Sequence, residues 1–260
     1  MKSLKKITLV KLGGSVITDK KVPYVAKVKV IKRLAKELKA CPTPLIIAHG
    51  SGSFGHTSAA LFGGKKGYKT TIGLAKVARD AMEINRIVMD ILVNEDLPAI
   101  SFRPLSMIMT NKGKTGSVFF KSLEEALAQG LIPVVYGDII LDKEWKSTIY
   151  SGETTLNNIA LYLKDKGFSI NKIIEVGETN GVYNDKKETI REITKTSWLK
   201  TKQFIFNPNR VDVTGGMTHK ISEALTIAKK GIETLIINGN KTNELSNAIL
   251  GKQTKGTVIS

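Results

Sequence analysis

The sequence predicts an α/β fold in which helices cover both faces of a mostly parallel sheet. Short apolar runs of strand length alternate with amphipathic helical patterns along the whole chain, which is typical of parallel sheets. Glycine-rich segments follow several of the runs, where such sheets carry their ligand loops. The 260 residues, 42% of them hydrophobic, are enough for a full hydrophobic core.

Each predicted strand is an apolar run, rich in β-branched residues, that stops at glycine, proline or polar residues. The first run ends before Gly13 and Gly14, which tolerate a positive φ. The predicted strands are 7–10, 44–48, 99–102, 132–135, 173–176 and 234–237. The segment 137–150 is predicted as a small hairpin with its turn near 142–144.

Helices are predicted where apolar residues recur three or four positions apart. The longest, 71–94, has no proline and no glycine after Gly73, and its apolar stripe includes Ile84 and Val88. The predicted helices are 26–38, 71–94, 122–128, 154–164 and 217–230. The segment from His49 to His56 is predicted as a glycine-rich loop. No linker or repeat divides the chain, so we expect a single domain over 1–260.

The charge of the chain favours small anions over nucleic acids. The net charge is +17, and only six of the 40 basic residues are Arg, while aromatic residues make up 6%. Nucleic-acid sites usually combine clustered Arg with stacking aromatics. We therefore expect no nucleic-acid partner, although a basic surface raises the local concentration of anionic small molecules.

The sequence contains no signal for a membrane or an oxidising compartment. Its one cysteine, Cys41, cannot form an intrachain disulfide, and no apolar run approaches the length of a membrane-spanning helix. The apolar stretch near the N-terminus is too short for a secretory signal. We expect a cytoplasmic protein without a membrane partner.

Three glycine-rich segments have the features of anion-binding loops. Glycines let backbone N–H groups approach a phosphate closely, and a following helix N-terminus adds partial positive charge. The segments are 11–15, 50–55 and 214–217, with Lys11, His56 and Lys220 in or soon after them. Three such segments indicate that more than one phosphate group is bound.

Each segment also has a plain structural explanation. Glycine pairs are often turns, a lysine after a loop is often solvated, and His56 alone could cap a helix. There is no Walker A motif, and 50–55 matches a dinucleotide GxGxxG motif only formally. Metal-ligand spacings are missing too. No metal site made by the protein is expected, and Mg²⁺ would arrive with a nucleotide.

Five segments resemble motifs of the isopentenyl phosphate kinases, in the amino acid kinase superfamily. They are KLGGSVITDK at 11–20, GSFGH at 52–56, PVVYGD at 133–138, DVTGGMTHK at 212–220 and GTVI at 256–259. They run in order along the chain, and GSFGH is the most specific, although fosfomycin kinases are similar there. The resemblance implies an open αβα sandwich, a homodimer, and ATP-dependent phosphorylation of isopentenyl phosphate to isopentenyl diphosphate for isoprenoid synthesis.

The resemblance also implies roles for individual residues, with the acceptor bound in the half 1–150 and ATP in the half 151–260. Lys11 and Lys20 would contact the transferring phosphoryl group, with Lys20 stabilising the transition state, and Lys220 would be a third catalytic lysine. His56 would bind the acceptor phosphate. The other acceptor-site residues would be Ser51, Gly55 and Gly152. The nucleotide-site residues would be Lys11, Gly13, Gly14, Ser15, Gly52, Glu178, Tyr183, Gly216 and Lys220.

A phosphate acceptor also fits the residue types themselves. The attacking oxygen of a phosphate monoester is largely ionised at neutral pH, since its second pKa is about 6. Such an acceptor needs no general base, whereas an alcohol usually does. The hydrocarbon part of the acceptor could lie against Val77, Ala81 or Ile84 of the long predicted helix, although these side chains could equally be core.

The chain departs from the family pattern at three positions that are usually Asp, where it has Glu153, Glu178 and Asn180. Glu moves the carboxylate by about 1 Å or more, and shifts of that size matter for positioning catalytic groups. Two alternatives therefore stand beside the first hypothesis. One is a kinase of another small phosphate or phosphonate, such as fosfomycin. The other is a catalytically weakened binding protein of the same fold.

Overall fold

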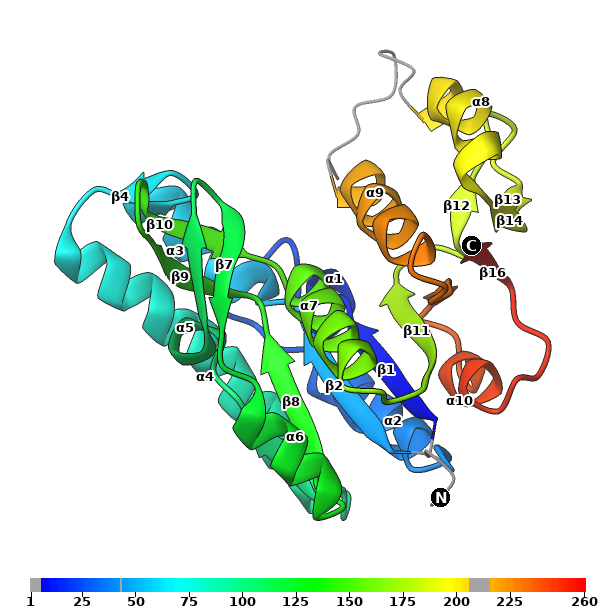
Figure 1. Ribbon diagram of the computed structural model, residues 1–260, viewed down its shortest axis with the longest axis horizontal. Helices are drawn as coiled ribbons and strands as arrows, with labels where there is room; N and C mark the ends of the chain where they lie inside the picture. Colours follow the sequence, from blue (N-terminus) through cyan, green and yellow to red (C-terminus); the bar gives the residue numbers. More distant parts are fainter. Residues whose placement is uncertain (1–5, 43, 206–215) are drawn as a thin grey trace.

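The centre of the molecule is an eight-stranded sheet (Figure 1). The structure, a computed structural model, describes residues 6–42, 44–205 and 216–260. In spatial order the strands are β14 (Glu192–Ile193), β16 (Gly256–Ile259), β15 (Thr234–Asn238), β11 (Ile170–Gly177), β1 (Ile7–Leu12), β2 (Leu45–His49), β8 (Ile132–Tyr136) and β5 (Ala99–Ser101). The six strands from β15 to β5 run parallel, and β16 is antiparallel to β15.

Helices cover both faces of this sheet, which confirms the α/β prediction and the open αβα sandwich. One face packs against α1 (Gly14–Ile17), α2 (Val28–Leu38), α4 (Thr71–Asn94) and α10 (Glu244–Ile249). The other packs against α6 (Lys121–Ala128), α7 (Gly152–Asp165) and α9 (Gly216–Ala228). Because both faces are covered, β1 is buried along its whole length and its sequence lacks a polar alternation.

The order of the strands places a switch point between β1 and β11. From β1 the chain continues to β2 on one side, whereas from β11 it reaches β15 on the other. Ligands of open α/β sheets bind where the connections diverge in this way, at the carboxyl ends of the strands. The carboxyl edge of β1 and β11 is therefore the expected location of a functional site.

A second, four-stranded sheet extends one end of the molecule, beside α4 in Figure 1. Its order is β10 (Lys146–Tyr150), β9 (Asp138–Asp142), β6 (Ile108–Asn111) and β7 (Lys114–Val118). The hairpin of β9 and β10 is the one predicted at 137–150, with the chain reversing after Asp142. The hairpin of β6 and β7 was not predicted. Two-stranded pairs are formed by β3 (Gly63–Gly64) with β4 (Gly67–Tyr68) and by β12 (Val182–Tyr183) with β13 (Thr189–Ile190).

The predicted loop after β2 was wrong, because a helix, α3 (Gly52–Phe62), begins there. Its first residues are glycine and serine, which are poor helix formers. Packing holds this helix in place. Phe54 is buried in the core on the sheet face covered by α2 and α4, which we call the main core, and α3 lies along α4. Helix α4 matches the predicted 71–94 at both ends. The remaining helices, α1, α5 (Pro104–Met107), α8 (Lys195–Ile205) and α10, were not predicted.

No helix among the described residues is both long enough and apolar enough to cross a membrane.

Asp142 holds the turns of the two larger hairpins together. Its buried carboxylate accepts hydrogen bonds from the backbone N–H groups of Lys112 and Gly113, at 3.1 and 2.8 Å, in the β6–β7 turn. It also accepts from Glu144 and Trp145, at 3.0 and 2.7 Å, in its own turn. Although burial opposes ionisation, these hydrogen bonds lower the pKa of Asp142 below its usual value.

Asp142→Ala should lower the free energy of unfolding by about 2 kcal/mol at pH 7, since hydrogen bonds to a charged group are lost. A lowered pKa in the folded state means that this stabilisation is present above the ordinary Asp pKa and fades as the pH falls below it. Urea unfolding of both proteins at pH 7 and at about pH 2.5, well below the ordinary Asp pKa, measures the difference. A difference that is the same at every pH would contradict this role of the charge.

Candidate functional site

The loops after β1 and β2 and the N-terminus of α7 meet at the carboxyl edge of the sheet. A Cβ on Gly14 would lie 2.7 Å from the backbone nitrogen of Gly52, and a Cβ on Gly152 would lie 2.7 Å from the carbonyl oxygen of His49. Gly52 also has a φ of +51°. These glycines therefore let three backbone segments touch, in addition to any role as phosphate loops.

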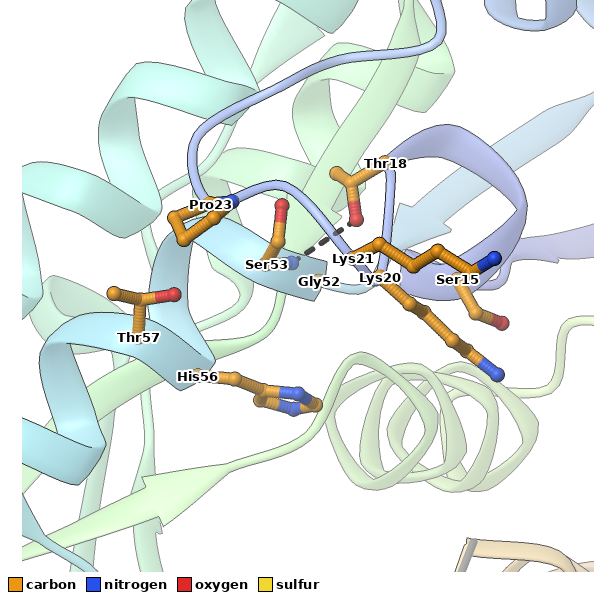
Figure 2. Close-up of a pocket in the computed structure, with 9 residues that line it drawn as sticks. All are labelled: Ser15, Thr18, Lys20, Lys21, Pro23, Gly52, Ser53, His56 and Thr57. Atoms are coloured by element: carbon orange, nitrogen blue, oxygen red, sulfur yellow. Dashed lines mark hydrogen bonds between the residues drawn. The ribbon is translucent and has the colours of Figure 1, made fainter. Parts of the chain in front are cut away.

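A pocket of about 170 Å³ opens beside these loops, and Figure 2 shows its lining. The side chains of Lys20 and His56 extend into the same space. The lining residues are Ser15, Thr18, Lys20, Lys21, Pro23, Gly52, Ser53, His56 and Thr57. Four of the predicted site residues, Ser15, Lys20, Gly52 and His56, thus lie around one pocket.

Thr18 joins the two loops that form the pocket, and the sequence analysis assigned it no role. Its hydroxyl donates to the carbonyl oxygen of Gly14 at 2.7 Å and accepts from the backbone N–H of Ser53 at 3.0 Å (Figure 2). The Ser53 hydroxyl is buried and has no hydrogen-bond partner within the described part of the chain. It is therefore an available donor for a ligand. In the sequence, the only feature that marks Ser53 is its position among the glycines of 50–55.

Lys11 lies within β1, not in the loop after it, and it is only 4% exposed. Its ammonium group forms a buried ion pair with Glu153, in the first turn of α7. Although burial opposes ionisation, the charges of Lys11 and Lys220 hold the pKa of Glu153 well below its usual range. The longer side chain at 153 thus still positions Lys11.

Two further charged groups, one buried and one half-buried, lie around this pair. Glu175 is the neighbour of Lys11 on β11 and is 3% exposed. Lys220, on α9, reaches the same edge: its ammonium nitrogen lies 4.0 Å from where a Cβ on Gly177 would be. Burial, followed by the charge of Lys11, lowers the pKa of Lys220. We refer to Lys11, Glu153, Glu175 and Lys220 as the charge cluster.

Lys20 forms a second Lys–Glu pair of a different kind. Its ammonium nitrogen lies 2.5 Å from a carboxylate oxygen of Glu178, and the two side chains are 52% and 30% exposed. Lys27 lies 4.0 Å from the same carboxylate. Exposed pairs contribute only about 0–1 kcal/mol, so Lys20 can exchange Glu178 for another anion at little cost.

Asn180, the third departure from the family pattern, takes part in a local hydrogen-bond network. Its side-chain oxygen accepts from the amide of Asn238 at 3.1 Å, and its backbone N–H donates to the hydroxyl of Tyr183 at 3.0 Å. The network ties the loop after β11 to the end of β15. The Tyr183 hydroxyl therefore accepts a hydrogen bond from the protein's own backbone.

The remaining predicted residues fall into two groups. Ser51 precedes α3, and a Cβ on Gly55 would lie 2.3 Å from the Ser51 hydroxyl, so these two residues pack closely in the first turn. Gly13 is close to β11, since a Cβ there would lie 2.7 Å from the carbonyl oxygen of Val176. Gly216 begins α9. The rest of the predicted third loop, 214–215, lies outside the described residues.

Four residues whose role the sequence did not determine are buried in the fold and do not line the pocket. The imidazole of His49 is completely buried, lies 3.1 Å from the side-chain oxygen of Asn85 and stacks on Tyr136. Val77, Ala81 and Ile84, considered for the hydrocarbon part of an acceptor, are buried, and Ile84 belongs to the main core.

Glu153→Gln should destabilise the protein by about 3 kcal/mol at pH 7, because it leaves Lys11 buried without its partner. Because the pKa of Glu153 is lowered in the folded protein, the difference in free energy of unfolding between the wild type and Glu153→Gln is present above the ordinary Glu pKa. It narrows as the pH falls below that value. Urea unfolding measures it. The double variant Lys11→Met, Glu153→Leu is the control and should recover most of the loss. A double variant less stable than Glu153→Gln would contradict this account of the pair.

Comparisons with known proteins agree with this arrangement. The family model described as "Amino acid kinase family" matches residues 6–238. Isopentenyl phosphate kinases of Methanocaldococcus jannaschii and Methanothermobacter thermautotrophicus are 33% and 32% identical, each alignment covering 97% of this chain and 98% of the relative.

Solved structures of isopentenyl phosphate kinases are also similar to this fold. One shares 30% identity with a TM-score of 0.82 and covers 97% of this chain and 100% of the other. A product complex of the Thermoplasma acidophilum enzyme shares 25% identity with a TM-score of 0.77 and covers 98% of this chain and 100% of the other. The chain therefore belongs to the amino acid kinase family, and to the isopentenyl phosphate kinases within it.

Proposed function

We propose that this chain transfers the γ-phosphoryl group of ATP to isopentenyl phosphate, giving isopentenyl diphosphate and ADP. The observation that carries the proposal is the composition of the pocket. Lys20 and His56 face one space, and the described residues that line it include no carboxylate that could act as a general base. An ionised phosphate acceptor needs cations and donors but no base. The activity of the full-length relatives supports the same acceptor.

In the proposed reaction an oxygen of the acceptor phosphate attacks the γ-phosphorus, and the bond from that phosphorus to the oxygen of ADP breaks. His56 holds the acceptor phosphate, assisted by Ser51, Gly55 and Gly152. Lys20 leaves Glu178 and stabilises the charge on the transferring group. That exchange is favoured because the exposed Lys20–Glu178 pair is weak and a phosphate group carries more negative charge than the Glu178 carboxylate.

The proposed nucleotide site is the charge cluster with the loops around it. Lys11 and Lys220 would bind the ATP phosphates, with backbone and hydroxyl donors from Gly13, Gly14, Ser15, Gly52 and Gly216. Fixed by Glu153, Lys11 keeps its direction during the reaction. Glu178 and Tyr183 would lie toward the nucleoside, at the carboxyl end of β11.

Mg²⁺ is proposed to be bound mainly by phosphate oxygens of the nucleotide. Among the described residues no group of three or more His, Cys, Asp or Glu side chains could hold a metal ion. The buried Lys11 and the half-buried Lys220 at the proposed nucleotide site fit a ligand that carries its own cation and excess negative charge. When bound, Mg²⁺ would neutralise charge on the phosphates.

The proposed organisation is a single domain with the acceptor in the half 1–150 and ATP in the half 151–260. The charge cluster supports it, because β1 contributes Lys11 from the first half while α7, β11 and α9 contribute the other members from the second. We also propose that the protein is a homodimer in the cytoplasm, as the resemblance to the family implies. Light scattering after size exclusion tests the dimer.

A coupled ADP-release assay with MgATP tests the function directly. Isopentenyl phosphate, dimethylallyl phosphate, fosfomycin and a blank are compared at equal concentrations, and the diphosphate product is identified by mass. We expect turnover of isopentenyl phosphate. Turnover of fosfomycin alone would show that the acceptor is a phosphonate and not isopentenyl phosphate. ATP binding without turnover of any acceptor would indicate a binding protein.

Lys20→Ala should lower kcat by about 100-fold or more, because it removes a cation from the developing charge. KM for isopentenyl phosphate should change little, and thermal stability should be unchanged because the pair with Glu178 is exposed. Lys39→Ala is the matched control, since Lys39, just after α2, also forms an exposed pair, with Asp96 at 3.3 Å, and does not line the pocket. Equal kcat values for the two variants would refute the role of Lys20.

His56→Ala should raise KM for isopentenyl phosphate by about tenfold or more, the value of one hydrogen bond to a charged group. KM for ATP should stay close to the wild-type value. His56→Asn, which keeps a donor of similar reach, should retain part of the affinity. A rise in KM for ATP instead would place His56 on the nucleotide side.

A further inference from the structure

Glu175 is a buried acid to which the proposed mechanism gives no task. The residue is 3% exposed, and one of its carboxylate oxygens is buried without a hydrogen-bond partner among the described residues. An ionised carboxylate in such a place is costly. Glu175 is therefore neutral part of the time or has a ligand-related role.

The register of the sheet puts Glu175 directly beside Lys11. The two residues are paired neighbours on the parallel strands β11 and β1. Ile173, two residues earlier on β11, packs on the face covered by α7, and residues two apart on a strand share a face. Glu175 thus lies on the side where Glu153 of α7 meets Lys11.

In the described part of the chain, the charged groups that act most strongly on Glu175 come from three elements packed around it. β1 contributes Lys11, α7 contributes Glu153, and α9 contributes Lys220 and Glu223. On the other side its β15 neighbour is Ile236, which carries no charge. The Glu223 carboxylate also accepts a hydrogen bond from Asn157 at 3.3 Å.

The net charge around Glu175 depends on its protonation state. The charges of Lys11 and Lys220 balance those of Glu153 and Glu223. The five groups together therefore carry no net charge when Glu175 is protonated and a charge of −1 when it is ionised. An ionised Glu175 would also compete with phosphate oxygens for the two ammonium groups. Protonation of Glu175 therefore favours any polyphosphate bound at the cluster.

We propose that Glu175 is a positioning residue that takes up a proton when the nucleotide binds, and so releases Lys11 and Lys220 to the phosphates. The proposal rests on the proposed function, which places the nucleotide phosphates at these two lysines. The proton comes from the solvent and returns to it when the nucleotide leaves. Nucleotide affinity accordingly becomes dependent on pH near neutrality.

The electrostatics of the cluster set the pH range. Burial and the Glu153 carboxylate raise the pKa of Glu175 to about 7, against the opposing charges of Lys220 and Lys11. Bound phosphates add negative charge nearby, which raises this pKa further. At pH 7 about half of the free protein molecules must then gain a proton on binding.

Titration calorimetry with MgADP measures this proton directly. Binding is followed at pH 7 in two buffers of different ionisation enthalpy, and the difference in heat gives the number of protons exchanged. We expect uptake of about half a proton by the wild type and none by Glu175→Gln, which resembles the neutral acid. Glu175→Leu is a second uncharged variant in case the first does not fold.

The dependence of Kd on pH separates Glu175 from Lys220, whose lowered pKa could also weaken binding in alkali. For the wild type, Kd for MgADP should rise with pH above 7, by up to about tenfold per unit. Glu175→Gln should flatten this rise, and Lys220→Arg, which stays charged, should keep it. A rise that persists in Glu175→Gln and vanishes in Lys220→Arg would overturn the proposal.

The outcomes distinguish this proposal from the proposed function. Wild-type protein that binds MgADP with no proton uptake and a flat Kd would refute the role of Glu175, whatever its acceptor. Wild-type protein that takes up the proton yet fails to phosphorylate isopentenyl phosphate would support Glu175 and contradict the proposed acceptor. Failure of MgADP to bind at all would overturn both.

Discussion

The buried ion pair between Lys11 and Glu153 is the interaction on which the rest of the site depends. Removing two charges from water costs several kcal/mol per ion, and a core strand offers no water to either group. The pair persists because the first turn of α7, which packs against β1, brings Glu153 to Lys11, beside the further charge of Lys220. A lysine fixed in this way has one direction available, toward the carboxyl edge.

The second constraint is the contact of backbones at that edge. Gly14, Gly52 and Gly152 each sit where a Cβ would come within 3 Å of a backbone atom of another segment. A side chain at any of these positions would push the loops apart and move the N-termini of α3 and α7 away from the pocket. The glycine pattern that first suggested phosphate loops is thus also the condition for assembling them.

The sequence predicted the layers well and the site only in part. Periodicity located α4 to the residue, because its 24 residues carry one continuous stripe. It failed for α3, where propensity opposes the helix and packing of Phe54 overrides it. Thr18 and Glu175 were missed for a related reason: their importance comes from strand register and loop contact, which no local pattern contains. Glu175 lies inside the predicted strand 173–176, where a single polar residue gives no indication of the charges beside it.

The three departures from the family pattern can now be compared by their surroundings. Glu153 is buried, and its extra methylene is accommodated while its bond to Lys11 is kept. Glu178 is partly exposed and holds Lys20 loosely, so its length matters little there. Asn180 replaces a charge with an amide whose oxygen accepts a hydrogen bond from Asn238, while its backbone N–H donates to the Tyr183 hydroxyl. In the proposed reaction the fixed Lys11 would hold the nucleotide phosphates, while Lys20, in its weak and exposed pair, would follow the charge as it moves.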